Sequence, residues 1–164
     1  MKPIAAAGAR AADRIGAALV AAILVAVIAG VARRYLLGAP IVWIDELTSV
    51  LFLWAVFWTA ALVVPLREHV AFELVEGMLP PGARRWIGVL AAAAAALALG
   101  AAAPKIVDFI LFLWRERTPA LQWRLDFVFA CFALFVIALA VRLLVRALRL
   151  CRRDWREELD PPAP

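Results

Sequence analysis

The stretch WIDELTSVLFLWAVFWTAALVVPLREH, which runs from Trp43 to His69, gives the clearest indication of the fold class of this chain. It opens with a Trp and two carboxylates, and the uncharged run Leu47–Leu66 then continues for 20 residues. About 20 apolar residues are enough to cross the hydrocarbon core of a bilayer as a helix. Polar groups stand at both ends of the run, where water and lipid headgroups solvate them. The stretch therefore predicts a transmembrane helix.

The composition of the whole chain supports this interpretation. Of the 164 residues, 66% are hydrophobic, and the mean hydropathy is +0.91. Soluble domains average about 45–50% apolar residues. A soluble protein of this length has too little interior to bury so much apolar surface. The solvent of this chain must be largely lipid.

Charged residues divide the chain into four apolar runs, which predict an all-α membrane protein with four transmembrane helices. The last run is short, and we expect its end residues to extend it by snorkelling their charged tips outward. The third helix is expected to continue past Lys105 to about Trp114. The runs are Ile15–Ala32, Leu47–Leu66, Trp86–Pro104 and Phe127–Val141. The predicted spans are residues 15–36, 43–66, 86–114 and 124–148, in one transmembrane domain of residues 1–150 followed by a cytoplasmic tail of residues 151–164.

Four spans place both termini on one side of the membrane, and the distribution of Lys and Arg indicates which side. With both termini inside, 12 of the 18 cations are cytoplasmic. Cationic loops are usually cytoplasmic, so the pattern favours both termini in the cytoplasm. The outer cations are then Arg33, Arg34, Lys105, Arg115, Arg117 and Arg124. The first run also has features of a cleaved signal peptide, but it is longer than a usual signal core and ends in Arg33-Arg34-Tyr35, which favours an uncleaved helix.

The second predicted helix has two different faces. At 100° per residue, bulky side chains and one carboxylate share one face, and small or hydroxyl side chains share the other. Small residues let helices approach closely in lipid, so two faces predict two neighbours. Trp43 also stands where an interfacial aromatic belt places a Trp. The first face holds Trp43, Glu46, Val50, Trp54 and Phe57, and the second holds Asp45, Thr48, Phe52, Ala55, Thr59 and Val63.

Two groups of ionisable residues have both a structural and a functional interpretation. Asp45 and Glu46 are potential proton or cation ligands, but their place in the first turns of a helix favours capping, or pairing with Arg33 or Arg34. Lys105 and Asp108 are spaced i, i+3, which favours a neutralised pair over a substrate site.

The segment after the second span predicts a short amphipathic helix at the cytoplasmic interface. Phe72, Val75, Glu76 and Leu79 follow helical spacing, and Pro80-Pro81-Gly82 is expected to end the segment. His69 is the only histidine. A single His without Cys or His companions makes a poor metal site, so we expect it to fix the start of the segment. The sequence predicts no metal or cofactor.

A basic stripe leaves the membrane with the fourth helix. Arg142, Arg146, Arg149 and Arg153 are spaced 4, 3 and 4 residues apart. A stripe that continues a span already lies against lipid phosphate, so we interpret it as a headgroup-binding surface rather than a nucleic-acid site. The two cysteines, Cys131 and Cys151, are about 30 Å apart on one helix, beyond disulfide reach.

Several motifs occur in an order that resembles a known family. They are Arg34-Tyr35, Trp43 with Glu46, the internal Trp54, His69 with Glu73, and a Thr-Pro-Ala-Leu turn at Thr118–Leu121. In this order and spacing the chain resembles the small membrane subunit (Q-type, DctQ-like) of TRAP transporters, the tripartite ATP-independent periplasmic uptake systems. Glu73 stands where that family usually has Asp, Thr59 where Gly is common, and the fourth helix lacks the family's Pro-x-Gly.

The resemblance implies a non-enzymatic accessory role in a multi-pass protein of the bacterial inner membrane. In such systems a large elevator-type subunit carries the substrate and sodium sites, and a periplasmic substrate-binding protein delivers an organic acid. The small subunit would brace the large one and help to dock the binding protein. The implied partners are these two proteins and membrane lipids, with no nucleic acid. The implied subunit-interface residues are Arg34, Trp43, Glu46, Trp54, Thr59, His69 and Glu73.

Two other classes of function need residues that the sequence does not provide. A stand-alone four-helix carrier or efflux protein acting as a dimer needs a membrane-buried carboxylate, and the middle of each predicted span has none. A membrane-embedded redox enzyme needs paired Cys or His ligands, which the sequence does not provide.

Overall fold

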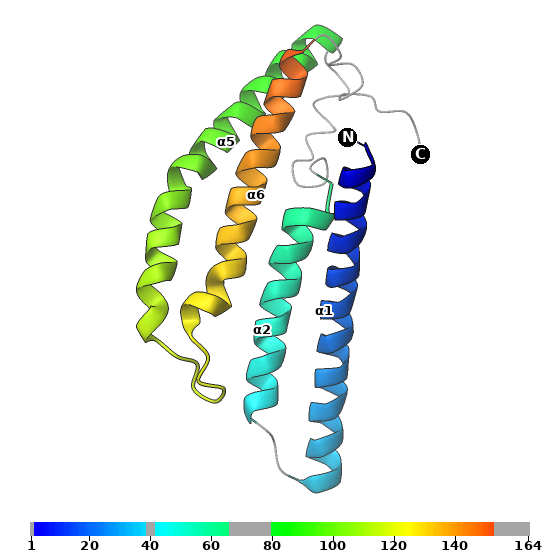
Figure 1. The fold of residues 1–164 in the computed structure, drawn as a ribbon, viewed down its shortest axis with the longest axis vertical. Coiled ribbons are helices and arrows are strands. Elements are labelled where there is room, and N and C mark those ends of the chain that lie inside the picture. Colours follow the sequence, from blue (N-terminus) through cyan, green and yellow to red (C-terminus); the bar gives the residue numbers. More distant parts are fainter. Residues whose placement is uncertain (1, 39–41, 66–79, 153–164) are drawn as a thin grey trace. The chain divides into compact units, whose positions relative to one another are not determined.

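The computed structural model describes residues 2–38, 42–65 and 80–152, and these residues are helical almost throughout (Figure 1). Four helical stretches are long and apolar enough to cross a membrane: Gly8–Leu36, Val42–Val63, Gly82–Arg115 and Leu125–Cys151. The predicted fold class is therefore confirmed. The predicted amphipathic segment, with His69 and Glu73, lies outside the described residues.

The helices differ from the predicted spans mainly at their ends. Helix α1 covers Lys2–Leu37, so it starts well before residue 15. Charged residues end the apolar span, but they do not interrupt the backbone hydrogen bonds. The helix therefore continues through the charged residues that precede the span. Gly38, with φ +67°, follows α1 in the left-handed conformation that commonly ends a helix.

The second and third spans each combine two types of helix. Helix α2 covers Val42–Trp58 and continues as a π-helix, η1, over Thr59–Val63. Helix α5 covers Pro81–Phe112 and continues as a 3₁₀ turn, η2, over Leu113–Arg115. Pro81 begins α5, and proline is well tolerated in the first helical turn because backbone N–H groups there have no acceptor within the helix. The fourth span is helix α6, Leu125–Cys151.

The internal contacts divide the chain into two compact units. The first comprises residues 1–63 and 105–135, and the second comprises residues 64–104 and 136–164. Helices α5 and α6 therefore contribute to both units, and on α5 the division follows Pro104. A single domain of residues 1–150 stays a prediction.

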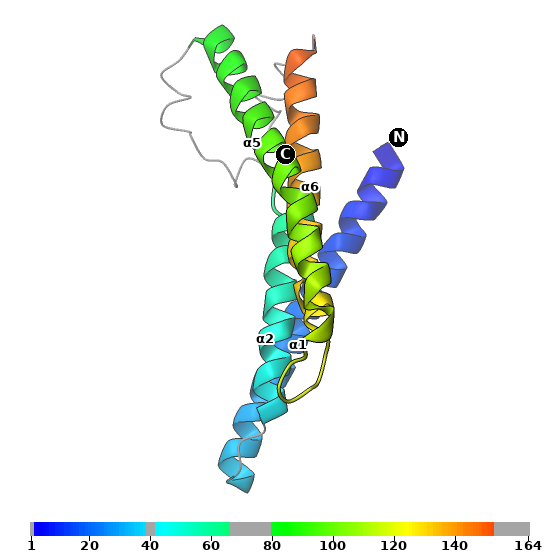
Figure 2. The same ribbon diagram turned by 90° about the vertical axis from the view of Figure 1, so that its left-hand side faces the viewer.

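In the first unit, α1 crosses and packs against α2 (Figure 2). Glycines on α1 allow the close approach: a Cβ at Gly30 would lie 3.1 Å from Ile44 Cγ2, and one at Gly16 would lie 3.8 Å from Thr59 Oγ1. The Trp58 indole donates a hydrogen bond of 3.1 Å from Nε1 to the Ala12 carbonyl of α1. The face of α2 that carries small and hydroxyl residues thus meets α1.

The bulky face of α2 meets the first turns of α6 within the same unit. The ring of Trp54 lies 5.5 Å from that of Phe127, and the ring of Phe57 lies 5.3 Å from that of Phe132 in an edge-on arrangement. Aromatic pairs at these distances add to simple burial. The two neighbours predicted for this helix are therefore both supplied by the chain itself.

In the second unit, α5 and α6 pack through small side chains. Ala92 and Ala96 of α5 are buried together with Leu143 and Ala147 of α6. A Cβ at Gly88 would lie 3.3 Å from Leu150 Cδ1. Small residues four apart on α5 thus form the seam that lets the helices approach in lipid.

Candidate functional site

Residues 116–124 form a hairpin between α5 and α6 that is held by several hydrogen bonds. Thr118 N–H donates to the Trp123 carbonyl at 2.9 Å, and Trp123 N–H donates to Thr118 Oγ1 at 3.0 Å. Gln122 adopts a positive φ of 56°, which is uncommon for a residue other than glycine, and its N–H donates to the Thr118 carbonyl. These bonds explain why Thr118, a polar residue, is buried.

Glu46 fixes this hairpin to α2. Its carboxylate accepts backbone N–H bonds from Ala120 at 2.7 Å and from Leu121 at 3.2 Å, and the Thr118 side chain hydrogen-bonds to it as well. The expected partners Arg33 and Arg34 form no salt bridge with Glu46 in the described residues. A carboxylate that satisfies two otherwise free N–H groups holds the turn in one conformation.

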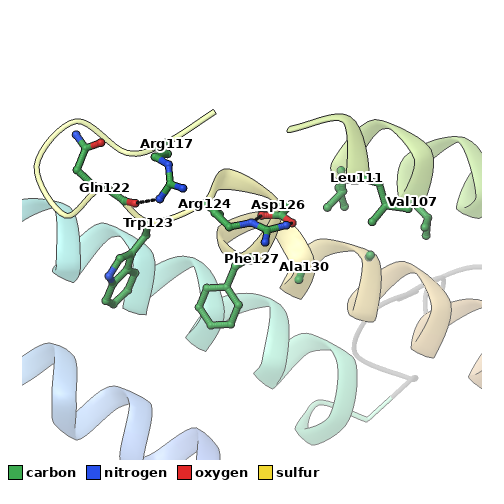
Figure 3. Close-up of a pocket in the computed structure, with 11 residues that line it drawn as sticks. Val107, Leu111, Arg117, Gln122, Trp123, Arg124, Asp126, Phe127 and Ala130 are labelled. Atoms are coloured by element: carbon green, nitrogen blue, oxygen red, sulfur yellow. Dashed lines mark hydrogen bonds and ion pairs between the residues drawn. The ribbon is translucent and has the colours of Figure 1, made fainter. Parts of the chain in front are cut away.

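A groove of about 800 Å³ lies beside the hairpin, between the end of α5 and the start of α6 (Figure 3). Its apolar lining is Val107, Ile110, Leu111, Phe127, Ala130 and Ala133. Polar residues of the hairpin and of the first turn of α6 form its mouth. Arg124 binds Asp126 through Nε at 3.1 Å and Nη2 at 2.6 Å, and Arg117 donates from Nη1 to the Gln122 carbonyl at 3.1 Å.

A smaller cleft, of about 360 Å³, lies between α1 and α2. Arg34 and Asp45 line it on opposite sides, together with Thr48 and Ser49. Both hydroxyl groups donate to backbone carbonyls four residues earlier, Thr48 to Ile44 and Ser49 to Asp45. The hydroxyl donors of the cleft are therefore already engaged within α2.

The structure places the predicted interface residues in different surroundings. Trp43 is 47% exposed at the start of α2, and Arg34 is exposed at the end of α1. Glu46, Trp54 and Thr59 are half-buried and make the contacts within the chain described above. Contact of these residues with a large subunit stays a prediction. His69 and Glu73 lie outside the described residues.

The predicted headgroup stripe is not uniform. Arg142 donates a hydrogen bond of 2.8 Å from Nη2 to the Val64 carbonyl just after η1. Arg146 is half-buried, and Arg149 is exposed. Arg153 lies outside the described residues, and lipid contact by the stripe stays a prediction.

Lys105 and Asp108 differ from the neutralised pair that their spacing predicts. Lys105 and Asp108 are both exposed and form no salt bridge in the described ranges, although their i, i+3 spacing allows one.

Arg85 was not singled out from the sequence, yet its Nε donates to the Leu150 carbonyl at 2.8 Å and its Nη2 to the Cys151 carbonyl at 3.1 Å. It thereby satisfies the free carbonyls at the end of α6.

The chemistry of the described residues is that of structural polar contacts. In residues 2–38, 42–65 and 80–152, no three His, Cys, Asp or Glu side chains come close enough to hold a metal ion. Among these residues, a carboxylate holds the hairpin, an apolar groove lies beside it, and arginines bind the carbonyls at helix ends.

Comparison with known proteins gives this architecture a family. A model of the tripartite ATP-independent periplasmic transporters, DctQ component, matches residues 9–153. The chain belongs to the DctQ family. None of the curated proteins compared with the chain matches it. The match extends from α1 to the end of α6 and includes the hairpin and the groove.

Membership of the DctQ family sets the broad role of the chain. It is the small permease component of a TRAP transporter and a multi-pass protein of the inner membrane. The family is one of transporter components rather than enzymes, and its members work with a large membrane subunit and a substrate-binding protein.

Proposed function

We propose that this chain is the fixed brace of its TRAP transporter. It holds the large, elevator-type membrane subunit in place and helps to dock the periplasmic substrate-binding protein. The complex performs sodium-coupled uptake of an organic acid. The observation that carries the proposal is the DctQ match over residues 9–153, nearly the whole described chain.

The internal contacts support a rigid rather than a moving subunit. Glu46 joins α2 to the hairpin before α6, and Trp58 joins α2 to the backbone of α1. Each contact links segments that are distant in sequence, so α1, α2 and the hairpin of the first unit hold one another. A stationary subunit needs such contacts between its segments, because the large, elevator-type subunit moves against it.

We propose that both termini are cytoplasmic, as the distribution of Lys and Arg favours. The end of α1, the start of α2 and the hairpin then face the periplasm. This end presents exposed cations at Arg33, Arg34 and Arg115. Arg and Trp are enriched among residues that dominate binding energy, so the substrate-binding protein is expected to dock here.

Trp43 is the proposed direct contact with the large subunit. It is a large aromatic side chain, 47% exposed, beside the anchored Glu46. Replacing an interface Trp by Ala commonly costs 2 kcal/mol or more, roughly a 30-fold loss of affinity. Trp43→Ala should therefore weaken co-purification of the large subunit. Trp86→Ala is the matched control, because Trp86 is 65% exposed on α5 in the other unit.

Deletion of this chain tests the role itself. We expect uptake by whole cells to be abolished while the purified substrate-binding protein keeps its affinity for substrate. Uptake by the large subunit and the binding protein alone would refute the brace role. Solute movement by this chain alone in vesicles would instead support the stand-alone carrier.

A further inference from the structure

The groove between the end of α5 and the start of α6 has an apolar floor along two membrane helices. Its lining on α6 extends from Asp126 to Ala133, which is about 10 Å at 1.5 Å per residue. Ala130 and Ala133 keep the α6 side shallow because their side chains end at Cβ, while Val107 and Leu111 form the opposite wall (Figure 3). A hydrocarbon chain lying along α6 matches this surface.

The mouth of the groove carries two arginines, Arg117 and Arg124, that differ in their partners. Arg124 is neutralised by Asp126, with which it forms a salt bridge of 2.6 Å. Arg117 is exposed, and its hydrogen bond from Nη1 goes to a neutral acceptor, the Gln122 carbonyl. Within the part of the chain that the structure describes, no carboxylate forms a salt bridge with Arg117.

The position of this cation along the membrane normal favours a lipid phosphate as its partner. The hairpin joins two membrane-spanning helices, so it lies at one membrane surface whichever way the chain is oriented. Trp123 lines the groove beside it, and Trp side chains concentrate at the headgroup level. A bilayer presents phosphates at this depth, directly above acyl chains at the depth of the groove floor.

We propose that the groove is a binding site for one phospholipid of the surrounding bilayer. Its phosphate accepts hydrogen bonds from Arg117 and from the N–H groups of Arg124 that Asp126 does not use. One acyl chain lies along α6 over Ala130 and Ala133. Because Glu46 holds the hairpin in place, the guanidinium groups are positioned before the lipid arrives. This inference does not depend on the brace role or on membrane orientation.

Photolabelling of the unmodified complex tests the site without a variant. The complex is placed in nanodiscs of phosphatidylglycerol that contain a small fraction of the same lipid with a diazirine on its acyl chain. We expect labelling to concentrate on the groove residues Leu111, Phe127 and Ala130. Equal labelling of the exposed apolar face of α1, such as Leu24 and Ile28, would show ordinary surrounding lipid and overturn the proposal.

Variants then test the two halves of the site. The number of phospholipids retained after detergent washing is measured by native mass spectrometry. Arg117→Gln should lower retention at least fivefold, and so should Ala130→Phe, which fills the groove. The matched control is Arg115→Gln, because Arg115 ends η2 just before the hairpin, does not line the groove, and lies over the Trp114 ring. Equal loss with Arg115→Gln, or no loss with Arg117→Gln in a variant with an unchanged melting temperature, contradicts the proposal.

Competition identifies the chemistry that is recognised. In mixed nanodiscs of phosphatidylglycerol and monogalactosyl diacylglycerol, which lacks phosphate, the wild-type complex should retain the phospholipid preferentially, and Arg117→Gln should lose the preference. Millimolar inorganic phosphate should not displace the lipid, because the acyl chain also contributes to binding. Displacement of the lipid by inorganic phosphate would show that the site binds a free anion, and it would overturn the lipid proposal.

The rival occupant is a helix of the large subunit. Ala130→Cys in a complex with cysteines placed along the large subunit distinguishes the two. Efficient disulfide formation at Ala130→Cys would assign the groove to protein and overturn the lipid proposal, while labelling of Ala130 by lipid in the absence of cross-linking supports it.

Discussion

The carboxylate of Glu46, in the second turn of α2, accepts a hydrogen bond of 2.7 Å from the backbone N–H of Ala120, which is 74 residues further along the chain. A second bond from Leu121 N–H reaches the same oxygen at 3.2 Å. Two motifs that look independent in the sequence, Trp-x-x-Glu and Thr-Pro-Ala-Leu, are therefore the two sides of one contact. The contact gives the hairpin its fixed position relative to α1 and α2 of the first unit.

Removal of this carboxylate should loosen the hairpin without unfolding the helices. Hydrogen bonds to a charged group contribute about 1.5–3 kcal/mol each, so Glu46→Ala should destabilise the hairpin by roughly 2 kcal/mol. Hydrogen exchange at Ala120 and Leu121 should accelerate more than tenfold. Glu46→Gln keeps one acceptor oxygen and should have an intermediate effect. Asp45→Asn is the control, since Asp45 is exposed on the neighbouring position. Unchanged exchange at both amides in Glu46→Ala would refute the anchoring role.

The membrane spans of this chain follow from its sequence, whereas the contacts between them do not. Long apolar runs such as Leu47–Leu66 specify spans by length and hydropathy alone, and all four were found. The two faces of α2 were also predicted from helical periodicity. Their partners were not, because a carboxylate near the start of a helix satisfies the same local rules whether it binds Arg34 or an amide 74 residues away.

Other features depend on local conformation that residue type specifies weakly. The π-helix η1 begins at Thr59, whose hydroxyl donates to the Ala55 carbonyl at 2.6 Å, a bond that tends to bend helices. Gln122 adopts a positive φ because its neighbours hydrogen-bond across the hairpin. The groove is lined by residues of α5, the hairpin and α6 together, so it appears only in the three-dimensional structure.

The close approach of α1 and α2 makes Gly30 sensitive to size. A Cβ there would lie 3.1 Å from Ile44 Cγ2, so Gly30→Ala should push the helices apart and cost roughly 1–3 kcal/mol. The melting temperature of the purified chain in detergent should fall accordingly. Gly100→Ala is a suitable control, because a Cβ at that helical position meets nothing within 4 Å. A melting temperature that falls equally in both variants would show that crowding against Ile44 is not responsible, because Gly→Ala at an uncrowded helical position should not destabilise the helix.

Arg85 should hold the end of α6 in place. Its guanidinium reaches two carbonyls, Leu150 and Cys151, that have no partner within the helix. Arg85→Gln should therefore increase hydrogen exchange in the last turn of α6 and cost roughly 1–3 kcal/mol. Arg85→Lys should restore only part of the stability, because an ammonium group is a point donor and lacks the planar fork of arginine. Arg152→Gln, at an exposed position just beyond α6, serves as the control and should have little effect.

Arg142 separates an internal role from a lipid role within the basic stripe. Its hydrogen bond of 2.8 Å to the Val64 carbonyl lies within the chain, so the bond should persist in detergent that contains no lipid. Arg142→Gln should lower the melting temperature equally in neutral detergent and in vesicles that contain phosphatidylglycerol. Arg146→Gln should have an effect mainly in the vesicles, where each cation near an anionic surface contributes about 1 kcal/mol. If both variants respond to anionic lipid to the same extent, Arg142 belongs functionally to the headgroup stripe and its bond to Val64 contributes little. If only Arg146→Gln responds, the regular spacing of the stripe conceals two different functions, one for the fold and one for the membrane surface.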